Sequence, residues 1–352
     1  MCIVYIGPGG GTSLHRARAL ERLGHEVCII DPWSWLGNSK WVGRWRYHAG
    51  AIGVGFLINK RVIAEVKTIR PEIIFVDQGE FLDRELLRKL REMNIPVVNY
   101  MIDDPFGGRD GLRFRNFLNA IPYYDLIAVV REPNVAEAQA RGARNVLKVW
   151  RSADEVAHTP RVLSEDQGSQ YASEVVFVGT WMPERGPFMA ELIKWGVPLS
   201  IWGDRWHKSK EWALIKPHWR GPGLYDDESY ASAIQGAKIC LGLLSKGNRD
   251  LHTTRSMEIP ALGGLLCAER TSEHRELYEE GLEAVFWKDA ADCARQCLAL
   301  LADELRRQAI AAAGHTRALH NGHYNERVMA KILNAAFGPE ESSCAIEEGG
   351  RS

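Results

Sequence analysis

The sequence predicts an α/β protein built from two open parallel sheets that face a central cleft. Short apolar runs alternate with amphipathic segments in both halves of the chain, which is the pattern of repeated β-α-β units. The apolar runs are continuous, as expected for parallel strands that helices cover on both faces. A polar stretch from Ser152 to Ser173 lacks hydrophobic periodicity and separates the halves. Ligands of such sheets bind at the carboxyl ends of the strands, so we expect one site built from both halves.

The first half, residues 1–151, is expected to fold around five strands. Strands are predicted at 2–6, 26–31, 73–77, 96–102 and 126–130, and a helix over 13–23. A glycine-rich loop joins the first strand to this helix.

The second half, residues 174–322, repeats the pattern after a linker at 152–173. Strands are predicted at 174–179, 198–203, 238–244 and 265–268, helices at 185–195 and 257–262, and a further segment of the alternation at 230–236. A last helix is predicted beyond this half, at 326–337. The acidic, glycine-containing tail 338–352 is expected to be disordered.

The composition excludes several classes of protein. The 44 basic and 45 acidic side chains give a formal net charge of −1, so no overall charge draws the chain to nucleic acid or to an anionic membrane. No apolar run reaches membrane-spanning length and no signal peptide is recognisable, so the cytoplasm is the expected compartment, with peripheral membrane contact left open. The seven cysteines contain no CxxC pair, and Cys293 and Cys297 are spaced i, i+4, which favours buried free thiols over metal ligands.

The segment from His252 to Trp287 carries the strongest candidate site. Arg255 and Glu258 lie near the start of the predicted helix, which Gly263-Gly264 ends. A guanidinium offers a fork of donors to phosphate oxygens, and a carboxylate can accept two hydrogen bonds from a ribose diol. These two side chains would therefore suit a nucleotide sugar. The alternative is an ordinary salt bridge between residues three apart on a helix.

The glycine loop is the candidate phosphate or sugar site of the first half. Its candidate residues are Gly9, Gly10, Gly11 and Thr12. Their amides can approach an anion closely, and Asp31 ends the second strand where a ribose-binding acid would lie. The loop matches a dinucleotide fingerprint only in part, because Thr12 replaces a small residue and Pro8 lacks an amide donor, so a structural turn is the alternative. His15 follows as a candidate general base or a helix-start residue.

Further candidates follow other predicted strands. Asp103 and Asp104 come after the strand at 96–102. At least one of them would face the cleft, where paired acids can bind sugar hydroxyls, unless Asp-Pro only starts a turn. Arg185 begins a helix after the strand at 174–179, where a guanidinium suits a diphosphate and a surface arginine is the alternative.

Four tryptophans, Trp33, Trp35, Trp41 and Trp45, fall in one segment, where their rings would stack on an acceptor sugar or pack under a loop. Arg44 and Arg46 beside them would contact a phosphorylated or lipid-linked acceptor.

Taken together, these motifs resemble the CgeB-like (spore-maturation-protein type) glycosyltransferases, which have the two-domain GT-B fold and belong to the glycosyl transferase group 1 set. The resemblance spans nearly the whole chain. Its landmarks are IGPGGGTSLHRARALERLGHEV, YMIDDP, VFVGTWMPERG, SIWGDRW, TTRSMEIPALGG and HYNERV. The family usually has an aromatic residue where Met257 stands, a change expected to alter helix packing more than donor chemistry.

The resemblance implies a Rossmann-like acceptor-side domain over 1–151 and a Rossmann-like nucleotide-sugar donor domain over 174–322. It also implies that the C-terminal helical segment, 323–337, crosses back to the first domain. The donor-binding residues that it implies are Thr254, Arg185, Arg255, Glu258, Gly263 and Gly264. Among these, Glu258 would contact the ribose and the two arginines would face the diphosphate. Asp103, Asp104 and the glycine loop would lie on the acceptor side, with Trp33 and Trp35 as stacking candidates there.

The predicted function is transfer of a sugar from a nucleotide-diphosphate sugar to a glycan, protein or lipid-linked acceptor, with retention of configuration. Arg185, Arg255 and helix amides would stabilise the departing diphosphate, so the scheme requires no metal or other cofactor. Inversion would require His15 or Asp104 as the base. The alternatives are a nucleotide-sugar epimerase of the same fold, an NAD-dependent oxidoreductase and a non-catalytic nucleotide-sugar-binding protein. Replacement of Glu258 by Ala is expected to weaken donor binding at least about tenfold with little change in melting temperature.

Overall fold

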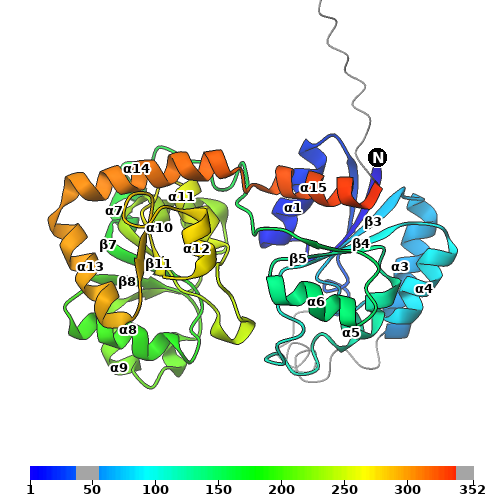
Figure 1. Ribbon diagram of the computed structural model, residues 1–352, viewed down its shortest axis with the longest axis horizontal. Coiled ribbons are helices and arrows are strands. Elements are labelled where there is room, and N and C mark those ends of the chain that lie inside the picture. Colours follow the sequence, from blue (N-terminus) through cyan, green and yellow to red (C-terminus); the bar gives the residue numbers. More distant parts are fainter. Residues whose placement is uncertain (37–54, 338–352) are drawn as a thin grey trace, which may run out of the picture.

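The computed structural model describes residues 1–36 and 55–337 and contains two α/β domains (Figure 1). The tail at 338–352 and the residues Trp41, Arg44, Trp45 and Arg46 lie outside the described residues. Among the described helices, none combines the length and the hydrophobicity that crossing a membrane requires.

The first domain has a parallel sheet of six strands. Its strands are β1 (Cys2–Ile6), β2 (Glu26–Ile30), β3 (Ile73–Asp77), β4 (Val97–Met101), β5 (Leu126–Val129) and β6 (Val146–Lys148), in the order β2-β1-β3-β4-β5-β6. Its helices are α1 (Gly11–Arg22), α3 (Gly55–Ile69), α4 (Arg84–Glu92), α5 (Arg115–Ala120) and α6 (Glu132–Ala140).

The second domain has a parallel sheet of six strands as well. Its strands are β7 (Ser173–Val178), β8 (Leu199–Trp202), β9 (Trp219–Gly221), β10 (Ala237–Gly242), β11 (Leu266–Glu269) and β12 (Val285–Trp287), in the order β12-β11-β10-β7-β8-β9. The helices after the first domain are α7 (Glu165–Tyr171), α8 (Arg185–Lys194), α9 (Trp212–Ile215), α10 (Asp227–Gln235), α11 (Arg255–Ala261), α12 (Ser272–Leu277), α13 (Ala290–Ala302), α14 (Glu304–Asn321) and α15 (Asn325–Phe337).

The nine strands predicted from the apolar runs are all present, and no end is shifted by more than two residues. The missed strands β6, β9 and β12 have three residues each, too few to form a recognisable apolar run. Helix α7 lies inside the segment taken as the linker. It begins at a capping box in which the Ser164 hydroxyl accepts from the Gln167 amide and the Gln167 side chain accepts from the Ser164 amide.

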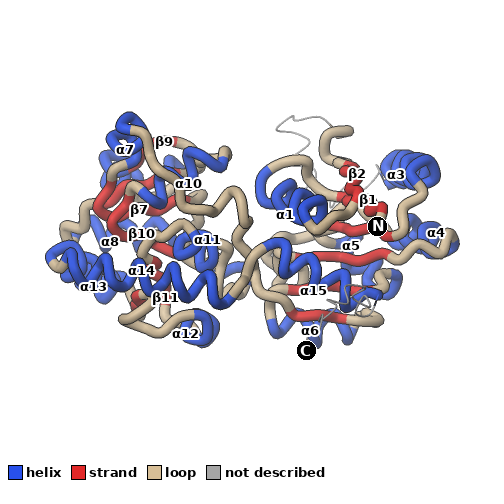
Figure 2. The backbone as a smooth tube through the Cα atoms, turned by 90° about the horizontal axis from the view of Figure 1, so that it is seen from above, coloured by secondary structure: helices blue, strands red, loops and turns tan. Residues whose placement is uncertain are grey.

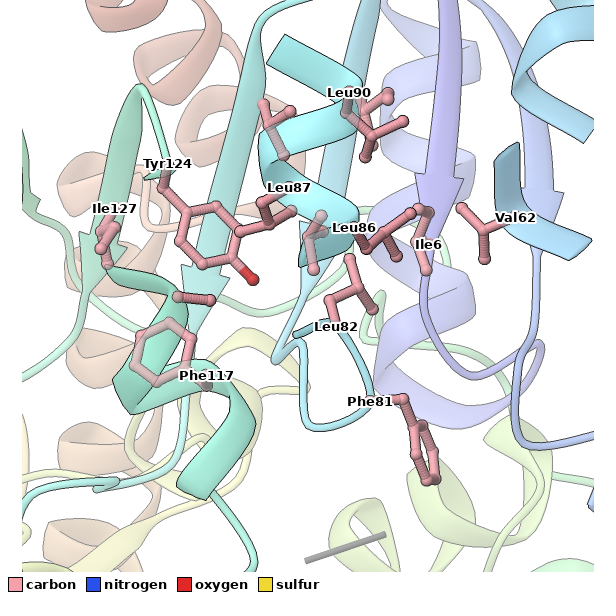
Figure 3. Packing of buried hydrophobic residues seen from close by; sticks show 14 of the residues in the cluster. Ile6, Val62, Phe81, Leu82, Leu86, Leu87, Leu90, Phe117, Tyr124 and Ile127 are labelled. Atoms are coloured by element: carbon pink, nitrogen blue, oxygen red, sulfur yellow. The ribbon is translucent and has the colours of Figure 1, made fainter. Parts of the chain in front are cut away.

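The core of the first domain shows why helices cover its sheet. Leu86, Leu87 and Leu90 lie on one face of α4 and are fully buried, because their spacing places all three toward the sheet (Figure 3). Phe117 on α5 and Tyr124 pack beside them, with their ring centroids 5.8 Å apart. The Asp83 carboxylate accepts a hydrogen bond from the Leu86 amide and caps the start of α4.

Helix α15 returns to the first domain after α14 has run along the second (Figures 1 and 2). Its buried side chains join the core that includes α1 of the first domain: Val328, Met329, Ile332 and Leu333. The two chain crossings between the domains lie side by side, because the Ala153 amide donates to the His323 carbonyl and the Asn325 amide donates to the Ala153 carbonyl. The domains are therefore joined by two paired segments.

Candidate functional site

Each sheet has one point where consecutive connections leave in opposite directions. In the first sheet this point lies between β1 and β3, and in the second it lies between β7 and β10. At such points the loops separate and leave a crevice at the carboxyl ends of the strands, where ligands of open α/β sheets bind. The structure has a pocket at each: about 340 Å³ in the first domain and about 230 Å³ in the second.

Arg185 lines the pocket of the second domain at the start of α8. Its side chain is buried, with 8% of the residue exposed, and its guanidinium donates to three main-chain carbonyls, those of Thr180, Leu243 and Leu244. Among the described residues, no carboxylate forms an ion pair with it. A buried cation without an acidic partner is costly, so this position would be stabilised by an anionic ligand.

The electrostatics around Arg185 agree with that interpretation. Burial lowers the pKa of Arg185 to about 10, and the nearby positive charges of Arg255 and Arg109 act in the same direction against Glu184 and Asp250. Three guanidinium groups therefore lie near one another at this crevice. A diphosphate is the kind of ligand that would neutralise them.

Arg255 reaches the same place from α11. Its Nε donates to the Val178 carbonyl at 3.2 Å, so its guanidinium lies at the carboxyl end of β7. It lies over the Tyr230 ring, 4.6 Å from the centroid, and its side chain is 30% exposed. Thr254 is the residue before the first turn of α11. The two arginines predicted to bind the diphosphate are thus brought together by β7.

Glu258 is more enclosed than its predicted role requires. Only 1% of the residue is exposed; Oε2 accepts from the Tyr230 hydroxyl at 2.7 Å and from Arg255, while Oε1 lies 3.5 Å from His158 Nε2. Burial raises the pKa of Glu258, but the Arg255 and His158 charges and the Tyr230 hydroxyl outweigh burial and hold the pKa below its ordinary value. The structure thus contains the ion pair that was the sequence-based alternative to a ribose contact. A ribose would have to displace His158 or Tyr230 to reach the Glu258 carboxylate.

Gly263 and Gly264 lie at the other end of α11, away from Arg255. Gly263 has φ 77° and turns the chain out of the helix, which favours glycine. A Cβ on Gly264 would lie 2.9 Å from Ile234 Cγ2, so this glycine allows α11 to pack closely on α10. At roughly 1.5 Å per helical residue, they lie more than about 10 Å from Arg255 along the helix. The structure therefore gives the pair a packing role and does not bring it to the arginine cluster.

Two residues that sequence reasoning missed complete the cluster. Arg109, from the loop after β4 of the first domain, crosses the cleft and donates to Ser245 Oγ and to Asn248 Oδ1. Gly247 makes this approach feasible, since a Cβ there would collide with the Arg109 side chain. Lys246 lines the same pocket as Arg185 and pairs with Glu269. Two short motifs in the sequence could have indicated them. Lys246 lies in SKGNR, which follows strand β10, and Arg109 lies in GGRDG, which follows Asp103-Asp104.

The glycine loop of the first domain opens α1, which begins at Gly11. Gly9, Gly10, Gly11 and Thr12 are all exposed. The Gly9 amide donates to Asp31 Oδ2 at 3.1 Å, and Asp31 Oδ1 accepts from the Trp33 amide at 2.8 Å. Asp31 thus fastens the loop to the end of β2, and its two oxygens are engaged with main-chain amides where a dinucleotide-binding acid would contact ribose.

His15 lies on α1 and faces the second domain. Its Nε2 lies 2.9 Å from Asp227 Oδ1 on α10, and its ring centroid lies 5.8 Å from that of His158. Its Nδ1 is buried and has no hydrogen-bond partner among the described residues. An aspartate on one ring nitrogen fixes the tautomer and leaves the other nitrogen as an acceptor.

Asp104 forms the main ionic contact between the domains. It is 2% exposed and accepts from Arg249 Nε at 2.6 Å and Nη2 at 2.8 Å, and from Asn134 at 3.0 Å. Burial raises the pKa of Asp104, but Arg249 and Asn134 outweigh burial and leave the pKa below its ordinary value. Asp103 points elsewhere and pairs with Arg113 at 3.1 Å. The two neighbouring acids therefore have different partners.

The pocket of the first domain lies beside that pair. Its lining residues are Ile6, Gly7, Pro8, Pro32, Trp33, Asp77, Gln78, Gly79, Glu80, Phe81, Leu82 and Arg113. Trp33 forms part of the wall and contacts Phe81 edge-on, with ring centroids 4.5 Å apart. Trp35 does not line the pocket and is covered by the Arg61 guanidinium, 4.2 Å from its ring centroid. Of the two tryptophans predicted to stack on an acceptor sugar, Trp33 is therefore the one placed to contact a ligand in this pocket.

The two cysteines on α13 are buried and form no disulfide among the described residues. Cys293 and Cys297 pack with Cys267 of β11 in the core of the second domain, and the three Sγ atoms lie within 4.8 Å of one another.

Comparisons with known proteins agree with this architecture. Residues 185–334 match the family model described as glycosyl transferase-like. No curated protein matches the chain significantly. The structure is similar to that of HepE from Anabaena in complex with UDP and glucose, with a TM-score of 0.68 at 11% identity over 95% of this chain and 98% of that one.

Two further solved structures give the same result. Sucrose-phosphate synthase from Thermosynechococcus elongatus has a TM-score of 0.67 at 12% identity, covering 95% of this chain and 98% of that one. A glycosyltransferase from Rickettsia africae has a TM-score of 0.62 at 12% identity, covering 95% of this chain and 97% of that one. The protein therefore has the two-domain GT-B fold, and its second half is similar to the glycosyl transferase-like family.

Proposed function

We propose that the protein is a glycosyltransferase of the CgeB-like type that transfers a sugar from a nucleotide-diphosphate sugar to a hydroxyl group of an acceptor. The observation that carries this proposal is the cluster at the carboxyl ends of β7 and β10. Arg185 is buried there with no acidic partner among the described residues, beside Arg255 and within reach of Arg109 from the other domain. A diphosphate placed there would receive charge-assisted hydrogen bonds from both halves of the molecule.

A uridine diphosphate sugar is the proposed donor. HepE binds UDP and glucose, and MnaA of S. aureus, which has a TM-score of 0.56 and 12% identity to this chain, binds UDP. These proteins share the fold of the chain, so their ligands support the choice of the first nucleotide to test.

In the proposed reaction the bond between the anomeric carbon and the donor phosphate oxygen breaks, and a bond from that carbon to the acceptor oxygen forms. Negative charge grows on the departing diphosphate, where Arg185 and Arg255 would stabilise it, so the scheme requires neither a metal nor another cofactor. We propose retention of configuration, with the departing phosphate oxygen taking the acceptor proton.

If the reaction inverts instead, a protein group must take that proton. Of the two candidates, His15 is the better placed, because its Nδ1 has no described partner while Asp227 holds its Nε2. Asp104 is held by two nitrogens of Arg249 and has a lowered pKa, which makes it a weak base.

The test is a thermal-shift screen of the protein against UDP, GDP, TDP, CMP and ADP sugars, with NAD and NADP alongside. A selective rise with the UDP compounds is expected, since a ligand at 100 times its dissociation constant stabilises by about 2.7 kcal/mol. Stabilisation by NAD alone would instead support an oxidoreductase, and silence throughout would support a protein without a working donor site. Proton NMR of the glycosylated product then identifies its anomer and so distinguishes retention from inversion. Recovery of an epimerised nucleotide sugar without acceptor would support the epimerase.

A further inference from the structure

We infer that the pocket between β1 and β3 binds an acceptor sugar that presents hydroxyl or ammonium donors and carries no phosphate or carboxylate. This inference rests on the proposed function and specifies the class of its acceptor. It narrows the sequence-based range, which included phosphorylated and lipid-linked acceptors. The argument comes from the hydrogen-bonding capacity of the described residues that line the pocket.

The cation of the lining, Arg113, is already occupied by protein groups. Its Nε and Nη2 contact Glu80, and Nη2 also donates to Gln78 Oε1 at 3.1 Å. Its Nη1 lies 3.1 Å from Asp103 Oδ2 and 3.2 Å from Asp110 Oδ2. A guanidinium has five N–H donors in a fixed fork, and contacts of this number leave none for a ligand phosphate. Among the described lining residues, the pocket therefore has no free cationic donor of the kind that an anionic acceptor would need.

Acceptor atoms, in contrast, are in excess. Asp77 is buried at the end of β3, and its Oδ2 accepts from the Tyr5 hydroxyl at 2.7 Å and from Arg16 Nη2 at 2.7 Å. Its Oδ1 is buried and has no hydrogen-bond partner among the described residues. A buried carboxylate oxygen without a donor is costly, and a ligand hydroxyl or ammonium group would satisfy it.

The local charge points the same way. Four carboxylates, Asp77, Glu80, Asp103 and Asp110, lie in or beside the lining and are paired with three cations, Arg16, Arg113 and Arg109. The described surroundings are therefore net acidic, which repels phosphate and attracts an amino group.

The shape suits a sugar ring. At about 340 Å³ the pocket is near the lower limit of small-molecule sites, which span roughly 300–1,000 Å³. Trp33 and Phe81 give it an aromatic wall, on which the C–H face of a pyranose can pack while its hydroxyls turn toward Asp77 and Glu80. The basic crevice of the second domain and this acidic pocket thus have opposite preferences, so a donor diphosphate is kept out of the acceptor position.

The experiment is saturation-transfer NMR on the full chain with UDP in excess, using glucose, glucosamine and glucose 6-phosphate as probes. Glucosamine and glucose should give transfer signals, with glucosamine the tighter, and glucose 6-phosphate should bind at least about tenfold more weakly than glucose, because an unpaired charge near the acids is unfavourable. Trp33→Ala should abolish the signals of both binding sugars, and Trp195→Ala, at an exposed tryptophan of the second domain, should leave them unchanged.

Glu80→Gln keeps the size of the side chain and removes one negative charge. It should narrow the gap between glucosamine and glucose 6-phosphate, whereas Glu85→Gln on the exposed face of α4 should not. Binding of glucose 6-phosphate as tight as that of glucosamine, or silence from all three sugars, would overturn the inference. Binding of UDP is measured separately by thermal shift. Failure of the acceptor inference can therefore be distinguished from failure of the proposed donor chemistry.

Discussion

At the scale of single residues, the site depends on charges whose partners the fold supplies or withholds. Arg185 and Arg255 both lie near the end of β7, but Arg255 has Glu258 as an acidic partner, whereas the partners of Arg185 in the described part of the chain are carbonyls. An arginine whose charge is not compensated within the protein gains more from an anionic ligand. Arg185 is therefore expected to contribute more to donor affinity than Arg255.

Replacement of Arg185 by Ala is predicted to weaken UDP binding by about tenfold to a hundredfold, since a hydrogen bond to a charged group is worth roughly 1.5–3 kcal/mol. Isothermal titration calorimetry measures the change directly. The matched control is Arg18→Ala on α1, whose guanidinium is exposed and pairs with Glu21. Equal UDP affinity in the Arg185 variant and the wild type would remove this residue from the donor site.

Replacement of Glu258 by Ala is now predicted to lower stability as well as donor binding. The sequence-based expectation of a nearly unchanged melting temperature assumed an accessible carboxylate, but the residue is 1% exposed and pairs with Arg255. Removal of one partner of a buried pair costs about 3–5 kcal/mol, and the exposure of Arg255 puts the expected loss at the lower end. Urea unfolding provides the measurement, and a midpoint within experimental error of wild type would contradict it.

The same residue predicts a pH dependence. The folded pKa of Glu258 is lowered from an unfolded value of about 4.3, so its contribution to stability is complete above that pH and is lost as pH falls through the folded pKa. Glu258→Gln has no such contribution to lose. The difference in unfolding free energy between wild type and variant should therefore narrow from pH 7 to pH 3, as followed by urea titrations; a constant difference would show that the carboxylate is not ionised in the folded state.

At the scale of elements, the helices have one apolar face each, and the position of that face decides which domain a helix joins. Helix α15 follows the second domain in the chain but packs its four buried apolar side chains against the first. The amphipathic pattern of residues 326–337 predicted a helix, since apolar residues recur at helical spacing. The pattern does not name the surface that the helix covers.

Replacement of Ile332 on α15 by Ala is predicted to destabilise the protein by about 2–5 kcal/mol, because a fully buried isoleucine leaves a cavity. The matched control is Leu319→Ala on α14, where the leucine is 56% exposed and the expected change is below about 0.5 kcal/mol. Chemical denaturation of both variants provides the comparison. Similar losses in the two variants would mean that α15 is not anchored on the first domain.

At the scale of the whole molecule, polar contacts across the cleft bind the two domains together near the site. Arg249 of the second domain pairs with Asp104 and also with Glu137 of the first. Asp250 of the second domain forms ion pairs with Arg131 and Arg151 of the first. These pairs flank Arg109, which reaches the second-domain loop at Ser245. The contacts that join the two domains and the contact that brings Arg109 to the second domain therefore lie close together in the structure.

Replacement of Arg249 by Ala is predicted to favour an open cleft, because it removes two hydrogen bonds to Asp104. The expected loss is roughly 1–2 kcal/mol of closure free energy after the partial exposure of Arg249 is discounted. Small-angle X-ray scattering should give a larger radius of gyration for the variant than for wild type, and saturating UDP should reduce the difference. Arg88→Ala on α4, far from the cleft, serves as the control, and an unchanged radius in both variants would refute the role of the pair.

The sequence by itself determined the fold class, the positions of the long strands and the placement of Arg185 at the start of a helix that follows a strand of the second domain. Apolar periodicity and strand-end chemistry are local properties, so nearby residues are enough to specify them. Trp33 was also found in this way, as an aromatic residue in a segment without regular periodicity.

Only the tertiary structure decided which side chains meet. Arg109 comes within reach of Ser245 although 136 positions separate them, and Asp104 is paired with Arg249 although 145 positions separate them. The enclosure of Glu258, the distance of Gly263-Gly264 from the arginines and the saturation of Arg113 depend equally on distant partners. The interaction energy of two charged side chains depends on their distance in space and on their burial. The local spacing of residues along the chain specifies neither.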